Sequence, residues 1–144
     1  MFARYSLTLV CLAALVVNFT SPVANAAAFP QVRTFAGGYI MGISTLAQYD
    51  YYNTLYPGTP VGCAFTFRPN STVDIYDDQG GTEYGTYIRF SGNSRITVTL
   101  TSSVSPYGPV KYELFRIGNN TSTQWWGEVR INGQIWGIFR VSQQ

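Results

Sequence analysis

Histidine is absent from all 144 residues of the sequence, and cysteine occurs only twice, as Cys11 and Cys63. Without histidine the chain cannot assemble a Ser-His-Asp or Cys-His catalytic site, or a zinc site with imidazole ligands. The GxSxG motif, the phosphate-binding loop and the glycine fingerprint of dinucleotide-binding folds are missing as well. These absences exclude the catalytic and zinc sites named here, and we expect no resident cofactor and no metal.

Charge is scarce too, because charged residues make up only 11% of the chain, with 9 basic and 7 acidic side chains. Acidic and basic residues alternate along the sequence, and no basic cluster occurs. Proteins that bind nucleic acids or anionic membranes concentrate positive charge on one surface. We therefore expect neither a nucleic acid nor an anionic membrane as a partner.

Only one long apolar run is present, at residues 6–17 near the start of the chain. It follows a short segment that carries the positive charge of Arg4, and it precedes small residues at 24–26. This order is typical of a secretory signal peptide, and a run of about 12 apolar residues is shorter than the roughly 20 that span a bilayer. We predict a signal peptide at 1–26 and a single β domain at 27–144. The protein is then exported, secreted or periplasmic, with no transmembrane segment after cleavage.

Export limits the covalent chemistry of the chain. Cys11 would be removed with the signal peptide, which leaves Cys63 as the only thiol and excludes an internal disulfide. We expect Cys63 to be a buried small hydrophobic residue, with an intermolecular bridge as the alternative. Sequons for N-glycosylation begin at Asn70, Asn119 and Asn120, all in predicted loops, and they matter only if the chain passes through a glycosylating secretory pathway.

Aromatic residues are abundant, at 16% of the chain, and polar and apolar residues alternate in short runs between turn residues. Such alternation predicts half-buried β-strands. The predicted strands are 36–43, 61–68, 72–77, 82–90, 95–101, 109–117, 124–131 and 134–142. Their mostly short connections favour an all-β antiparallel meander of about eight strands, closed or nearly closed into a barrel, with a two-sheet β-sandwich as the alternative. The barrel resembles the calycin-like architecture of lipocalins and avidins, although no diagnostic motif of either family occurs.

Two hairpins have registers that the burial pattern can select. In the first, pairing Phe67 with Val73 places the apolar residues of both strands on one face. In the second, a three-residue loop at 91–93 would pair Ile88 with Ile96. The residues that this second register turns inward are Tyr84, Ile88, Phe90, Ile96, Val98 and Leu100.

The strongest hairpin signal is the Asn-Gly pair at 132–133, which lies between two apolar runs and predicts a type I′ turn. Uninterrupted alternation from this turn pairs Ile131 with Gln134 and Val129 with Trp136. The inward residues are then Trp125, Val129, Ile131, Trp136 and Ile138. The opposite face carries a second group of large apolar residues, Trp126, Ile135, Phe139 and Val141, which is more than one core requires.

Residues 44–60 do not follow the strand pattern. The segment contains four tyrosines, and its aromatic and apolar residues recur at helical spacing from Leu46 to Tyr56. One or two helical turns are therefore expected before Pro57 ends them. We expect this tyrosine-rich segment to lie across one end of the barrel as a lid.

Carboxylates are the remaining groups that could carry chemistry. Asp74, Asp77, Asp78 and Glu83 gather around a Gly-Gly turn, where oxygen ligands could hold calcium, but an ordinary solvated turn is the simpler interpretation. Two carboxylates about 5–9 Å apart could also cleave a glycoside, although the sequence does not show which pair would meet. We therefore predict that the protein is not an enzyme, with a carboxylate-based glycosidase as the enzymatic alternative.

The leading functional hypothesis is a binding protein that holds one small, mostly apolar or aromatic ligand inside the barrel. Its expected ligand-binding residues are Trp125, Trp136, Tyr84, Phe65 and Phe90 in the interior, with Tyr49 and Tyr52 in the lid. The alternative is a protein–protein interaction module, such as an inhibitor, adhesin-like or assembly protein, that binds a protein partner or a second copy of itself. Its exposed patch would consist of Trp126, Phe139 and Val141. Carbohydrate binding through exposed tyrosines is a third hypothesis.

Overall fold

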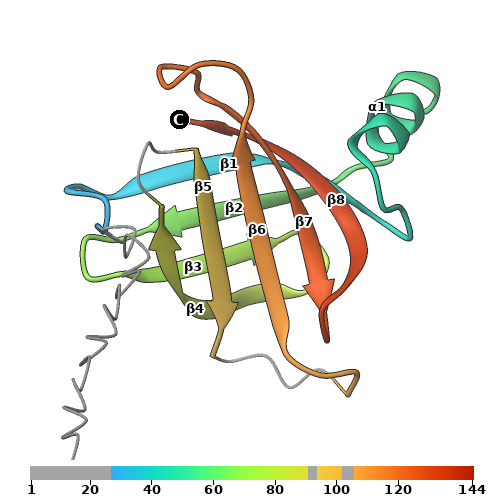
Figure 1. The fold of residues 1–144 in the computed structure, drawn as a ribbon. Helices are drawn as coiled ribbons and strands as arrows, with labels where there is room; N and C mark the ends of the chain where they lie inside the picture. Colours follow the sequence, from blue (N-terminus) through green and yellow to red (C-terminus); the bar gives the residue numbers. More distant parts are fainter. Residues whose placement is uncertain (1–26, 91–93, 102–105) are drawn as a thin grey trace, which may run out of the picture.

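The computed structural model describes residues 27–90, 94–101 and 106–144. These residues form a barrel of eight antiparallel strands with one helix on its outer wall (Figure 1). The elements in chain order are β1 (Arg33–Met41), α1 (Leu46–Leu55), β2 (Val61–Phe67), β3 (Thr72–Asp77), β4 (Gly81–Arg89), β5 (Arg95–Leu100), β6 (Val110–Arg116), β7 (Gln124–Ile131) and β8 (Gln134–Gln143). The predicted signal peptide at 1–26 lies outside the described residues. No helix within the described ranges is long and apolar enough to cross a membrane.

The strands follow one another around the barrel in sequence order, and β1 closes it by pairing with β8. This closing pair runs from Phe35 opposite Gln143 to Met41 opposite Gly137. A closed barrel leaves no strand edge exposed, because every strand has a neighbour on both sides. The predicted barrel is therefore confirmed, and the two-sheet alternative is not formed.

The predicted strand bounds agree closely with the structure except at β1. β2 to β8 begin and end within one residue of the predicted bounds, whereas β1 begins at Arg33 instead of residue 36. The first residues of β1 pair with the last residues of β2, Arg33 with Phe67 and Thr34 with Thr66. Pairing with β2 thus extends β1 to residues 33–35, where polar and apolar side chains do not alternate clearly. The predicted pairing of Phe67 with Val73 between β2 and β3 is confirmed.

The predicted register between β4 and β5 is wrong by one residue. Ile96 pairs with Arg89 instead of Ile88, and this slip exchanges the two faces of β4. Tyr87 is consequently buried, whereas Ile88 is 50% exposed and Tyr84 is 54% exposed. The predicted loop at 91–93 lies outside the described residues.

Contacts with other segments select this register. The hydroxyl group of Tyr87 donates a hydrogen bond to Arg68 O at 2.8 Å and accepts one from Phe29 N–H at 2.8 Å. The guanidinium group of Arg89 lies 4.6 Å from the centre of the Phe29 ring, within the range of a cation–π interaction. These interactions stabilise a β4 orientation that the alternation of β4 alone disfavours.

The Asn-Gly turn at 132–133 is confirmed, with φ angles of 50° and 80°. The first pair after the turn is as predicted, but Val129 pairs with Gly137 instead of Trp136. Trp136 is therefore the extra residue of a β-bulge, and its side chain is 37% exposed. Its predicted position in the interior is wrong.

The bulge reverses the two faces of the rest of β8. Phe139 and Val141 point into the barrel and are buried, whereas Ile138 packs on the outside beneath α1. Phe139 lies opposite Gly127, and a Cβ atom on Gly127 would overlap the Phe139 ring. A glycine on one strand thus provides the space for a large ring on the next.

One end of the barrel is filled by five rings that we call the aromatic plug. They belong to Phe29, Phe35, Phe67, Tyr87 and Trp125, and none is more than 4% exposed. Neighbouring ring centroids lie 4.9 to 6.0 Å apart, a range in which aromatic pairs contribute stability beyond simple burial. Phe29 precedes β1 and seals this end of the barrel.

The helix predicted within 44–60 is confirmed as α1. Thr45 caps its first turn, because the Thr45 side chain accepts a hydrogen bond from Gln48 N–H and the Gln48 side chain accepts one from Thr45 N–H. This reciprocal pair is a capping box. The helix ends at Leu55, before Pro57.

α1 lies on the outer wall of the barrel, beside β8 (Figure 1). Tyr49 is buried against the wall, and its hydroxyl group donates to Gly38 O at 3.1 Å. Arg140 of β8 donates to both carboxylate oxygens of Asp50, each at 2.7 Å. The helix therefore covers the side of the barrel, and its predicted position across one end is wrong.

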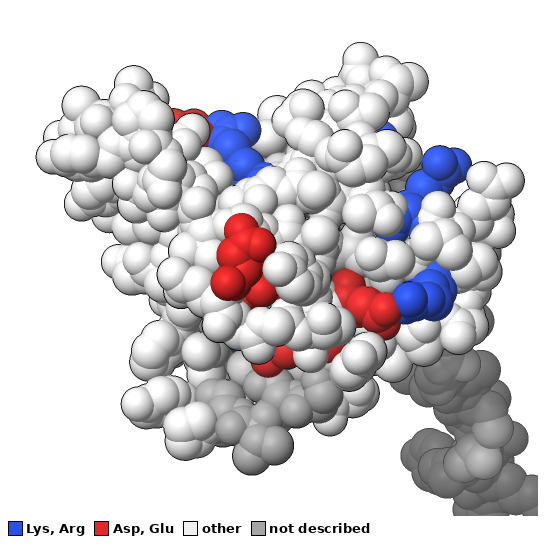
Figure 2. Space-filling view, turned by 180° about the vertical axis from the view of Figure 1, so that it is seen from behind, with Lys and Arg blue, Asp and Glu red and all other residues white. Residues whose placement is uncertain are grey.

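Charged side chains are few on the surface, and most of the face seen in Figure 2 is uncharged. Within the described part of the chain, four arginines form ion pairs with acidic residues at N–O distances of 2.6 to 2.8 Å. The pairs are Arg68–Asp74, Arg95–Glu113, Arg130–Glu128 and Arg140–Asp50. The two more exposed pairs, Arg68–Asp74 and Arg140–Asp50, contribute at most about 1 kcal/mol each to stability. The core, not these pairs, holds the barrel together.

Candidate functional site

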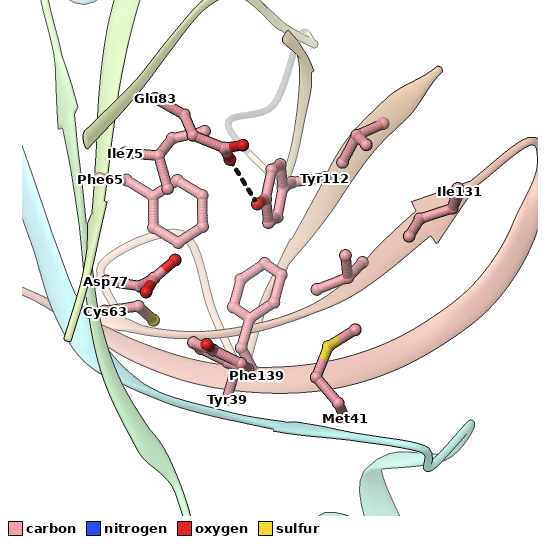
Figure 3. Close-up of a pocket in the computed structure, with 12 residues that line it drawn as sticks. Tyr39, Met41, Cys63, Phe65, Ile75, Asp77, Glu83, Tyr112, Ile131 and Phe139 are labelled. Atoms are coloured by element: carbon pink, nitrogen blue, oxygen red, sulfur yellow. Dashed lines mark hydrogen bonds between the residues drawn. The ribbon is translucent and has the colours of Figure 1, made fainter. Parts of the chain in front are cut away.

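The end of the barrel opposite the aromatic plug contains a cavity of about 240 Å³ that opens to solvent. Figure 3 shows the side chains that line it. Twelve of the described residues line it, and they come from every strand except β5. Four of them contribute rings, namely Tyr39, Phe65, Tyr112 and Phe139. Most of the others are aliphatic or sulfur-containing, and two are the carboxylates Asp77 and Glu83.

Strand alternation explains why these side chains meet. Phe65 pairs with Ile75, which in turn pairs with Glu83, so three neighbouring strands each point one side chain into the cavity. Asp77 lies two residues beyond Ile75 and points the same way. Asp77 and Glu83 are therefore diagonal neighbours on adjacent strands, a relation that places residues about 7–8 Å apart. Figure 3 shows both carboxyl groups directed toward the cavity.

Each carboxylate is held in place through one of its oxygens. The hydroxyl group of Tyr112 donates to Glu83 Oε2 at 3.3 Å. Asp77 Oδ1 accepts hydrogen bonds from the N–H groups of Gln79, at 2.7 Å, and Gly80, as in an Asx turn. The second oxygen of each carboxylate has no hydrogen-bond partner among the described residues, and it remains available to a bound molecule.

Burial and negative charge shift the acid–base properties of the cavity. Burial is the main cause of a raised pKa at Glu83. The hydrogen bond from Tyr112 lowers this pKa, and the charge of Asp77 raises it. Burial and the Glu83 charge strongly raise the pKa of Tyr112. The pKa of Tyr39 is raised by burial and by the Asp77 charge. The cavity therefore disfavours any additional negative charge.

Cys63 also lines the cavity, as a free thiol that is 8% exposed. Its predicted burial is confirmed. Burial, together with the charges of Asp77 and Asp78, raises the pKa of the thiol to about 12. Because the thiolate is the reactive form, this environment makes Cys63 a poor nucleophile.

We expect iodoacetamide to alkylate Cys63 very slowly in the folded protein. At about pH 8, a thiol with this pKa has on the order of a thousandfold less thiolate than an ordinary cysteine. The extent of alkylation over time, measured by mass spectrometry, checks this expectation, with the protein unfolded in guanidinium chloride as the control. Equal rates in the folded and unfolded protein would show that the thiol is accessible and ordinarily acidic.

The four acidic residues around the β3–β4 turn do not converge on one point. Asp74 forms its ion pair with Arg68, whereas Asp77 caps the turn and lines the cavity with Glu83. Across 27–90, 94–101 and 106–144, no group of three or more histidine, cysteine, aspartate or glutamate residues could hold a metal ion. Asp77 and Glu83 are the two carboxylates of this group that line the cavity.

Only one of the predicted ligand-binding residues, Phe65, lines the cavity. Trp125 lies inside the barrel as predicted, but it belongs to the aromatic plug. Trp136 instead stacks on Tyr107, with ring centroids 5.4 Å apart. Tyr84 points outward because of the β4 register.

The other three predicted ligand-binding residues also lie away from the cavity. Phe90 is half-buried just beyond the end of β4, with the guanidinium group of Arg95 5.0 Å from its ring centre. Tyr49 is buried between α1 and the outer wall. Tyr52 is 39% exposed on α1, where its ring meets the edge of Tyr51.

The predicted interaction patch is not formed. Phe139 and Val141 are in the interior, at 1% and 2% exposure. Trp126 remains on the outer wall, where it is partly buried and stacks on Phe115 at 4.8 Å between ring centroids. The large apolar residues of the β7–β8 hairpin are therefore divided between the core and the outer surface beneath α1.

Sequence reasoning missed several cavity residues, including Tyr39, Met41 and Tyr112. Alternation in β6 carried a usable signal, since Val110, Tyr112 and Leu114 share one face and the last of these is fully buried. Nothing in the local sequence distinguishes the end of a barrel that is filled from the end that is open.

No protein-family model matches the chain, and no curated protein matches it in sequence. The cavity, its rings and its two carboxylates are therefore the observations from which a function is argued.

Proposed function

We propose that this chain is an exported β-barrel binding protein that holds one small, mostly apolar ligand in its open cavity. The observation that carries the proposal is a space of about 240 Å³ inside a barrel whose other end is tightly packed with rings. Protein interiors are otherwise packed as densely as organic crystals, with few voids larger than a water molecule. A space of this size exceeds what folding alone requires.

The volume limits the size of the ligand. An engineered apolar cavity of about 150 Å³ binds benzene, so the present cavity suits a molecule on the order of ten non-hydrogen atoms. Pockets for drug-sized molecules are larger, at about 300–1,000 Å³. The ligand is then the size of one substituted ring, smaller than a long lipid or a peptide.

The chemistry of the lining supports the same function. The rings of Phe65 and Phe139, with centroids 5.2 Å apart, provide apolar surface, and the Tyr112–Glu83 hydrogen bond fixes a polar group beside them. Small-molecule sites commonly combine apolar walls with a few polar groups in set positions. The competing interaction hypothesis loses its basis, because Phe139 and Val141 are not on the surface.

Binding of 1-aminonaphthalene, a fluorescent ring compound that is neutral at neutral pH, tests the proposal. We expect increased, blue-shifted emission with a dissociation constant on the order of 0.1 mM. Ile131→Trp should weaken this binding by about tenfold or more, because Ile131 lines the cavity and an indole ring would occupy it. Fluorescence titration, excited where the protein does not absorb, measures both values.

Ile88→Trp is the matched control, since it makes the same change on the outer wall, where Ile88 is 50% exposed. It should leave the affinity for 1-aminonaphthalene unchanged. No emission change with the unsubstituted protein, or equal weakening by both variants, would refute binding in the cavity.

A further inference from the structure

Negative charge without a matching positive charge is concentrated at the cavity. All seven acidic residues lie within the described ranges, and four of them pair with the arginines named above. Asp77, Asp78 and Glu83 are the three that form no ion pair with any described residue. Two of these three, Asp77 and Glu83, line the cavity.

Among the described residues, no positively charged side chain belongs to the cavity wall. None of the twelve residues that line the cavity is lysine or arginine. Asp77 and Glu83 lie between rings (Figure 3), and each keeps one oxygen unused by the described residues. Partly dehydrated carboxylates without a counter-ion are unfavourable, and a bound cation would offset that cost.

We infer that the ligand is a small protonated amine, with its ammonium group at Asp77 and Glu83 and an aromatic or aliphatic body against the rings. The inference rests on the proposed function and adds the charge of the ligand to it. The rings of Tyr39 and Tyr112 would attract the cation in addition to covering its carbon atoms. A carboxylate or phosphate ligand would be repelled by the same two charges.

Three probes of nearly equal size and different charge test the inference. They are 2-phenylethylammonium, 2-phenylethanol and phenylacetate, each measured by displacement of 1-aminonaphthalene and by ligand-observed NMR at neutral pH. We expect the ammonium probe to bind on the order of tenfold more tightly than the alcohol, since charge-assisted hydrogen bonds are about twice as strong as neutral ones. Phenylacetate should show no detectable binding.

The double variant Asp77→Asn, Glu83→Gln removes both charges and keeps the oxygens that accept hydrogen bonds from the turn and from Tyr112. We expect its preference for the ammonium probe over the alcohol to disappear. Asp78→Asn is the matched control, because it removes an unpaired carboxylate that does not line the cavity. The control should keep the preference. Circular dichroism establishes that each variant is folded.

The outcomes separate the inference from the function on which it rests. Equal binding of the ammonium probe and the alcohol, or a preference that survives in the double variant, overturns the inference and leaves the proposed function standing. If neither 1-aminonaphthalene nor any of the three probes binds, the proposed function fails and the inference fails with it.

Discussion

Replacing Trp125 with alanine is expected to lower the free energy of unfolding by about 3–5 kcal/mol. The side chain is fully buried in the aromatic plug, at 0% exposure. Its ring lies 5.4 Å from that of Phe35 between centroids, and the Arg116 guanidinium group lies 4.6 Å from its centre. Alanine would remove these contacts and leave a void that the surrounding strands cannot fully close. Since small domains are stable by only about 5–15 kcal/mol, urea denaturation should show a large shift.

Trp125→Phe is the matched control. The Nε1–H group of Trp125 is buried, and no described residue accepts a hydrogen bond from it. Such an unsatisfied group costs about 1–3 kcal/mol, so phenylalanine removes an unfavourable group and still keeps a ring in the plug. We expect it to lower the free energy of unfolding by less than about 2 kcal/mol. Equal losses for alanine and phenylalanine would contradict the assigned role of ring packing.

Gly127→Ala is the second change with a large expected effect, a loss of about 3 kcal/mol in the free energy of unfolding. A Cβ atom at this position would overlap the Phe139 ring and the carbonyl oxygen of Glu113. The first contact can move only by displacing a ring of the core, and the second belongs to the backbone of the adjacent strand. Thermal and urea unfolding measure the loss.

Gly58→Ala separates this clash from the ordinary cost of replacing a glycine. Gly58 has a φ of +98° and open space around it, so its substitution meets backbone strain alone and should cost about 1 kcal/mol. Phe139→Leu should restore part of the stability lost in Gly127→Ala, because residues in contact are energetically coupled. Additive losses in the Gly127→Ala, Phe139→Leu double variant would show that the ring is not what the glycine accommodates.

The fold class and most strand bounds could be predicted because alternation and turn residues act locally. The two register errors have different causes. A bulge at Trp136 shifts the pairing by one residue, and the run at 135–139 is apolar enough to fit either face. At β4, hydrogen bonds from Phe29 to Tyr87 and from Tyr87 to Arg68 select the observed face. Phe29 and Arg68 lie outside β4, so the alternation of residues within β4 cannot reveal these contacts.

The site was less accessible to prediction than the fold. The acidic residues around the β3–β4 turn were recognised as a group, but only strand pairing shows that Asp77 and Glu83 point inward together. Most of the predicted ligand-binding residues were misplaced because the two register errors put Tyr84 and Trp136 on the outside and because α1 lies on the outer wall. Ring size gave no further guide, because a large ring is as useful for filling the barrel as for lining a cavity. Trp125 and Phe65 share one interior and have these two different roles.

The aromatic plug closes one end of the barrel, so the cavity is open at the other end only. Whatever occupies the cavity must arrive and depart through the same opening, beside the β3–β4 and β7–β8 turns. A polymer cannot be threaded through such a tube, so only a free molecule or the tip of a chain could be held. Asp77 is the last residue of β3. A ligand that binds this carboxylate would therefore enter the cavity with its opposite end first. A tether attached next to the trailing group would then extend into the solvent.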